Sequence, residues 1–131
     1  MRITGIDHLV LTVASIEAAV DFYSRVLGME VITFGRGRTA LRLGDQKINL
    51  HAARAPIAPH ADRPVPGSAD LCLVAVGGVD AAAAHLAACG VPVELGPVER
   101  AGARGPIKSL YVRDPDRNLV EFAFYDGAAE A

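Results

Sequence analysis

The stretch "GIDHLVLTVASIEAAVDFYSRVLGMEV" (5–31) has an ungapped counterpart in "GSADLCLVAVGGVDAAAAHLAACGVPV" (67–93), so the offset between the two copies is 62. Each copy begins with an alternating apolar run typical of a half-buried strand and continues into a helical stretch. Each helical stretch closes at a glycine, Gly28 or Gly90, which suits the left-handed residue that follows many helices. An internal repeat of this kind predicts a supersecondary unit that occurs twice.

Strand-like runs with period two follow the helix in both copies. They are residues 29–34, 39–43 and 47–52 in the first copy, and 91–98, 108–112 and 118–125 in the second. When "DQKINLH" (45–51) is aligned with "PDRNLVE" (115–121), the offset rises to 70, which leaves eight extra residues around "VERAGARGPI". The glycines of that insertion suggest a mobile loop.

The repeat therefore predicts an α+β fold made of two βαβββ modules. We expect a single domain over residues 1–131, with module 1 at about 1–53, a linker at 54–66 and module 2 at about 67–126. The linker is rich in proline, which favours an extended connection over a helix.

Composition narrows the possible partners. The 131 residues are 51% hydrophobic and carry a net charge of −2, with acidic and basic residues interspersed. This pattern argues against nucleic acid or an anionic membrane as partner and favours a small molecule. No apolar run reaches the roughly 18 residues of a membrane span, so we expect a cytoplasmic protein. Its two cysteines, Cys72 and Cys89, are interpreted as reduced core thiols.

Four potential metal ligands lie on the less apolar faces of four expected strands: His8, His51, Asp70 and Glu121. The repeat pairs His8 with Asp70 and His51 with Glu121. Two imidazoles and a carboxylate are a common divalent-metal set that leaves positions open for substrate oxygens. Glu121 lies between apolar neighbours, where a buried carboxylate must be paired, protonated or metal-bound. Asp70 is either a further ligand or a hydrogen-bond partner of a histidine.

Other polar residues are weaker candidates. The arginines and the lysine around the insertion, Arg100, Arg104 and Lys108, are positioned to meet an anionic substrate, although a solvated basic loop is an equal alternative. His60 and His85 are expected at the surface.

Several segments also carry a family resemblance. The doubled unit, "IDHLVLTV" (6–13), "FYSRVLGMEV" (22–31) and "YVRDPDRNLVEF" (111–122) resemble the vicinal oxygen chelate superfamily of glyoxalase, fosfomycin-resistance, bleomycin-resistance and extradiol dioxygenase proteins. Within it, "GDQ" (44–46) and "PVPGSADLCL" (64–73) are similar to the single-domain proteins called glyoxalase domain-containing protein 5.

The resemblance implies a curved mixed sheet with a concave cavity, helices on its convex side, and one divalent ion (Zn, Ni, Mn or Fe). It implies His8, His51 and Glu121 as ligands, with Asp70 as a further candidate. The expected activity is that of a glyoxalase-like lyase or isomerase. Such an enzyme binds vicinal substrate oxygens and stabilises an enolate, and Glu121 or Asp70, released from the metal, would act as the base.

Two other functions stay open at this point. One is an Fe(II) extradiol dioxygenase that cleaves catechol-type rings, and the other is a non-catalytic module that binds a drug or metabolite. We also expect a homodimer, whose modules either pair within one chain or swap between chains.

Overall fold

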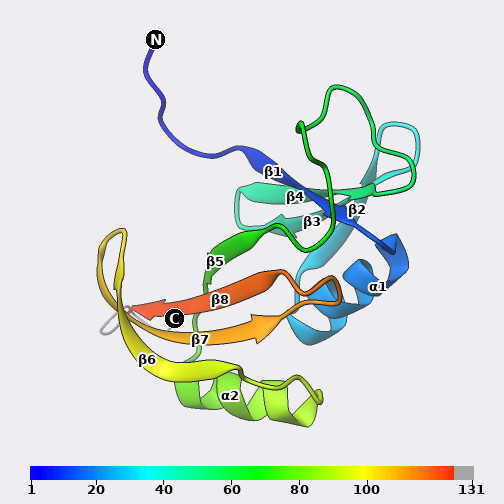
Figure 1. Ribbon diagram of the computed structural model, residues 1–131. Coiled ribbons are helices and arrows are strands. Elements are labelled where there is room, and N and C mark those ends of the chain that lie inside the picture. The colour runs from blue at the N-terminus through cyan, green and yellow to red at the C-terminus, as the bar shows by residue number, and fades with distance from the viewer. Residues whose placement is uncertain (126–131) are drawn as a thin grey trace. The chain divides into compact units, whose positions relative to one another are not determined.

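The computed structural model describes residues 1–125 and divides the chain into two compact units, residues 1–68 and the residues from 69 onward. Each unit contains a four-stranded sheet and its own helical segment (Figure 1). The last position expected for module 2, residue 126, lies outside the described residues.

The first unit is a βαβββ module. Its strand β1 (His8–Val13) leads into helix α1 (Ile16–Val20), which continues as a π-helix, η1 (Asp21–Val26). Three strands follow, β2 (Glu30–Phe34), β3 (Arg38–Leu43) and β4 (Gln46–Ala52). The order in the sheet is β1-β4-β3-β2, with β1 parallel to β4 and the other pairs antiparallel.

The second unit repeats this plan with β5 (Asp70–Val74), α2 (Val79–Ala88), β6 (Leu95–Gly102), β7 (Gly105–Arg113) and β8 (Leu119–Tyr125). Its sheet order is β5-β8-β7-β6, and β5 runs parallel to β8. The predicted α+β class with a doubled βαβββ module is therefore confirmed. No helix among the described residues is long and apolar enough to cross a membrane.

Local sequence explains where the helical segments begin and end. The Ser15 hydroxyl accepts a hydrogen bond from the Ala18 N–H at 3.1 Å, which satisfies one of the unpaired donors at the start of α1. Gly28 and Gly90 have φ values of +74° and +72°, as the sequence predicted for the residue that ends each helical stretch.

Each sheet buries its apolar face. In the first unit the buried set combines strand residues with the helical segment and comprises Leu11, Val13, Ala19, Phe22, Tyr23, Val26, Leu41, Ile48 and Leu50. In the second unit it includes Leu86 of α2 and the strand residues Leu110, Val112, Val120, Phe122 and Phe124. The opposite face of each sheet carries the polar side chains that are candidates for function.

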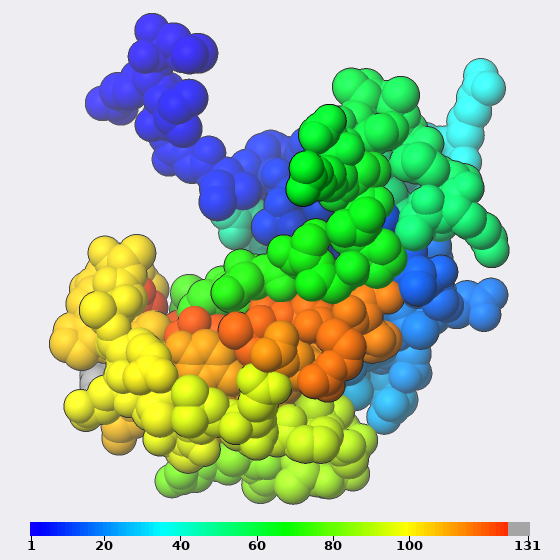
Figure 2. All heavy atoms as spheres, in the orientation of Figure 1, coloured from blue at the N-terminus to red at the C-terminus, as the bar shows by residue number. Residues whose placement is uncertain are grey.

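The insertion in the second copy is a hairpin and not the expected mobile loop. Strands β6 and β7 stay paired up to Gly102 and Gly105, so only Ala103 and Arg104 form the turn. Figure 2 shows this hairpin in yellow as a projecting ridge. The glycines flank a tight two-residue turn, a use of glycine that composition alone does not distinguish from flexibility.

We expect Gly96→Ala to destabilise the protein by roughly 2–4 kcal/mol, because a Cβ there would collide with the Ser109 carbonyl oxygen and lie 3.1 Å from Leu110 Cα. Its φ of +119° adds strain. Gly90→Ala is the control, because it has a positive φ but open space, and should cost only about 1 kcal/mol. Urea unfolding measures both, and equal losses would contradict the steric argument.

Candidate functional site

The strand register changes which residue of β4 corresponds to Glu121. In the second unit, Cys72 lies opposite Glu121. In the first unit, Val10, which aligns with Cys72 at the offset of 62, lies opposite Asn49. The glycines that end the two helical stretches share that offset, which supports the alignment of the first strands. The counterpart of Glu121 is therefore Asn49, and the sequence prediction that it is His51 is wrong.

The physical reason lies in the turns before the last strands. Residues 44–45 join β3 to β4, whereas residues 114–118 join β7 to β8, so an ungapped alignment across these turns misplaces the last strand. The longer turn is built by Asp114, whose carboxylate accepts hydrogen bonds from the backbone N–H groups of Asp116 and Asn118, both at 2.9 Å.

The same register separates the two predicted histidine ligands of the first unit. His8 lies opposite Lys47, four residues before His51, which corresponds to roughly 13 Å along the strands at about 3.3 Å per residue. The His8 Nδ1 atom is 2.7 Å from Asp7 Oδ1, in an exposed pair. The first unit thus has both imidazoles on one face of its sheet but not at one point.

His51 is buried and has a defined partner. Arg38 Nη2 donates to His51 Nε2 at 3.2 Å, and because a guanidinium only donates, Nε2 must carry the lone pair. Burial, followed by the positive charge of Arg38 and then by His60, lowers the pKa of His51. His51 is therefore held neutral.

Asn49 lies on β4 between Lys47 and His51 and on the same face of the sheet. It is buried, with 5% of its surface exposed. Its side-chain oxygen Oδ1 has no hydrogen-bond partner among residues 1–125. An unsatisfied buried acceptor costs roughly 1–3 kcal/mol, so a residue of this kind calls for a ligand or another functional explanation.

Glu121 is half-buried in the second unit and has polar neighbours on its own face. The Ser109 hydroxyl donates to Glu121 Oε2 at 2.7 Å. Desolvation, then the charge of Glu121 and a hydrogen bond to it, raise the pKa of the Cys72 thiol to about 11. Cys72 is an exposed free cysteine, so the prediction that it is a core thiol is wrong, and Cys89 is only half-buried. In this sheet the apolar row is the face opposite to Cys72.

Asp70 is exposed and lies opposite Leu119, two residues before Glu121 on β8. The two carboxylates therefore share a face of the sheet. Among residues 1–125, neither unit by itself contains a group of three or more His, Cys, Asp or Glu side chains that could hold a metal ion.

The basic residues of the hairpin divide between the two faces. The Arg100 Nε donates to Tyr111 Oη at 3.1 Å, and Tyr111 lies opposite Glu121. The Arg104 guanidinium lies 4.3 Å from the centre of the Tyr125 ring, on the same face.

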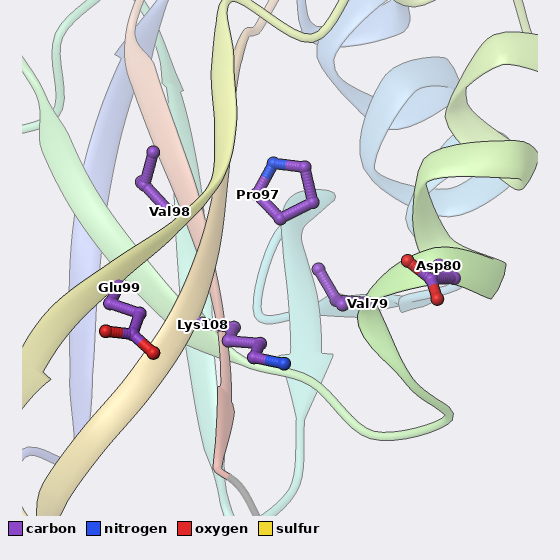
Figure 3. A pocket seen from close by; sticks show the side chains of 6 residues that line it. All are labelled: Val79, Asp80, Pro97, Val98, Glu99 and Lys108. Carbon is purple, nitrogen blue, oxygen red and sulfur yellow. The ribbon is translucent and has the colours of Figure 1, made fainter.

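Lys108 lies on the opposite face of this sheet. There it lines a cavity of about 300 Å³ with Val79 and Asp80 at the start of α2 (Figure 3). It therefore does not share a face with Glu121. His60 and His85 are exposed, as the sequence predicted.

Comparison with known proteins identifies the superfamily to which the chain belongs. A sequence model of the Glyoxalase/Bleomycin resistance protein/Dioxygenase superfamily matches residues 5–122. The chain is 48% identical, over 98% of its length and 72% of the relative's, to the glyoxalase domain-containing protein RDO1 of Mycosarcoma maydis. The chain belongs to this superfamily.

Solved structures agree with this assignment. The crystal structure of virulence protein STM3117 from Salmonella typhimurium is 47% identical and covers 95% of this chain and 99% of its own, with a TM-score of 0.93. Lactoylglutathione lyase from Agrobacterium tumefaciens is 26% identical and has a TM-score of 0.71, over 95% of this chain and 96% of its own.

The environment of His51 predicts a pH effect. Because its pKa in the folded protein is lowered, the folded state binds fewer protons than the unfolded state as the pH falls through the ordinary value of about 6.5. The contribution of His51 to the free energy of unfolding should therefore decrease below about pH 6.5. Arg38→Met removes a neighbouring positive charge and should raise the His51 pKa toward its ordinary value.

An NMR titration of the histidine ring protons measures this change, with exposed His85 of the second unit as the internal reference. A His51 pKa that is the same in Arg38→Met as in the wild type would contradict the assigned electrostatic contact.

Proposed function

We propose that the chain is a metal-dependent, glyoxalase-like lyase or isomerase that binds a small substrate through two vicinal oxygens. The observation that carries this proposal is the buried, unpartnered Oδ1 of Asn49 at the position equivalent to Glu121. His8 and Asp70 occupy the equivalent first-strand positions. The proposed ligands are thus His8, Asn49 and Glu121, with Asp70 as the fourth. His51, predicted from the sequence, is the alternative to Asn49.

The chemistry of this donor set fits a divalent ion. One imidazole, one amide oxygen and two carboxylates provide nitrogen and oxygen ligands of the kind that Zn, Ni, Mn and Fe accept. His8 and Asn49 belong to the first unit, and Asp70 and Glu121 belong to the second.

The bound ion would polarise the substrate oxygens and stabilise the negative charge of an enolate. Glu121 is the proposed general base: its carboxylate, released from the ion, would remove the proton next to the substrate carbonyl. The Ser109 hydroxyl orients the Glu121 carboxylate through its 2.7 Å hydrogen bond. Cys72, with a pKa of about 11, remains a neutral thiol near pH 7 and donates toward the same carboxylate.

Two arginines of the second unit bear on the charge of the substrate. Arg100, linked to Tyr111 opposite Glu121, and Arg104 at the hairpin turn are proposed to contact an anionic part of the substrate. The sequence predicts Lys108 as a third cation for this contact, but its position beside α2 gives it no direct part.

The proposal also covers the oligomeric state and the cellular location of the protein. Among the described residues, β1 and β5 each pair with one strand only, and both carry exposed valines, Val10 and Val74. Unpaired apolar edges favour association, so we propose a homodimer. Two free cysteines suit a reducing, cytoplasmic environment.

Metal affinity of the purified protein tests the ligand set. We expect Asn49→Leu and Glu121→Gln each to weaken binding of a divalent ion by about 10-fold or more, because the first removes a donor atom and the second removes the negative charge of a ligand. His51→Gln should change the affinity by less than about 3-fold. Titration calorimetry with Zn, Ni, Mn and Fe(II) measures this, and urea unfolding of each variant checks that it is folded.

Other results of the metal titration would favour a different ligand set or a different function. A large loss in His51→Gln with none in Asn49→Leu would support the ligand set predicted from the sequence. If the wild type binds no divalent ion, the metal mechanism fails and a non-catalytic binding module becomes the better explanation. If iron binds best, catechol cleavage is assayed first; otherwise isomerase activity is assayed first.

A further inference from the structure

The first unit carries two cations, Arg38 and Lys47, that lie against one aromatic ring, Phe34. We propose that this group, here called the cation pair, binds an oxyanion, either carboxylate or phosphoryl, carried by the substrate. This inference rests on the proposed function in one respect, the placement of the substrate's vicinal oxygens near Asn49.

The geometry of the cation pair is compact. The Lys47 ammonium nitrogen is 3.7 Å from the centre of the Phe34 ring, and the Arg38 guanidinium carbon is 4.9 Å from it. Both distances are within the range of cation–π attraction, and all three residues are half-buried. Both positive charges therefore lie against the same ring, where water screens them only in part.

Charge balance distinguishes the cation pair from the rest of this face. Among residues 1–125, no carboxylate forms an ion pair with Arg38 or Lys47. By contrast Arg42, on the same strand as Arg38, has its Nε 3.3 Å from Glu30 Oε1. Two like charges without a counter-ion repel each other, and a bound oxyanion would relieve this repulsion.

Arg38 is also fixed in direction. Its Nη2 donates to the buried imidazole of His51 at 3.2 Å, so one side of the planar guanidinium is anchored while its other N–H groups can serve a ligand. A guanidinium held in this way is preorganised to bind a carboxylate or phosphate with two hydrogen bonds. This gives His51 a positioning role that does not require it to hold a metal.

The cation pair lies on the face that also carries the proposed ligand from β4. Alternation along β4 places Lys47, Asn49 and His51 on one face, and Asn49 is two residues from each of the others. A substrate whose vicinal oxygens lie near Asn49 would therefore have its acidic group within a few atoms of them. Short 2-oxo and 2-hydroxy acids have this chemistry.

Binding of inorganic phosphate and of glycolate, a 2-hydroxy acid, tests the proposal in the full chain by titration calorimetry, with and without the preferred metal. The variants are Arg38→Gln and Lys47→Gln, with Arg42→Gln as the matched control on the same strand. We expect each of the first two to weaken phosphate binding by about 10-fold, the typical effect of a lost charge-assisted hydrogen bond. Arg42→Gln should match the wild type, and Arg38→Lys should retain part of the affinity.

Three results would overturn the proposal: no phosphate or glycolate binding to the wild type, an equal loss in Arg42→Gln, or glycolate binding that requires metal and is unchanged in Arg38→Gln. The last would leave the proposed metal function standing. Phosphate binding that depends on Arg38 in a protein that binds no metal would support the cation pair and reject the metal mechanism. Urea unfolding of each variant identifies losses due to misfolding.

Discussion

The parallel pairing of the first and last strands in each module is the constraint on which the candidate site depends. Hairpin connections place β2, β3 and β4 side by side, and β1 joins the sheet next to β4 and parallel to it, with α1 and η1 between β1 and the hairpins. The same holds for β5 and β8. The candidate ligands lie on these four strands, and the register between them decides which side chains are neighbours.

The two modules differ in the chemical groups on their polar faces. The polar face of the first unit carries imidazole, amide and cationic groups. Arg38 donates a hydrogen bond to His51, and the Lys47 ammonium lies over the Phe34 ring. The corresponding face of the second unit carries the carboxylates of Asp70 and Glu121, the latter bonded to Ser109. A repeated backbone thus presents two sets of polar groups with different chemistry, one on each module.

The structural surroundings of some residues do not follow from their local sequence pattern. The hairpin around Gly102 and Gly105 has the composition of a loop, and only pairing between β6 and β7 shows that it is ordered. Lys108 belongs to the same basic segment as Arg100 and Arg104, yet its position in β7 directs it to the face beside α2. Cys72 lies on the same face of its sheet as Glu121, opposite to the apolar row, so it is exposed although a free thiol is usually a core residue.

The sequence by itself determined the doubled βαβββ plan, the order of elements and the face on which each candidate metal ligand lies. These follow from local periodicity, from glycines at helix ends and from the internal repeat. Only the tertiary structure decided that Asn49, not His51, corresponds to Glu121. A shift of two residues between neighbouring strands leaves every side chain on the same face, so the hydrophobic pattern is unchanged and cannot reveal it. The backbone hydrogen bonds between β1 and β4 fix the register instead.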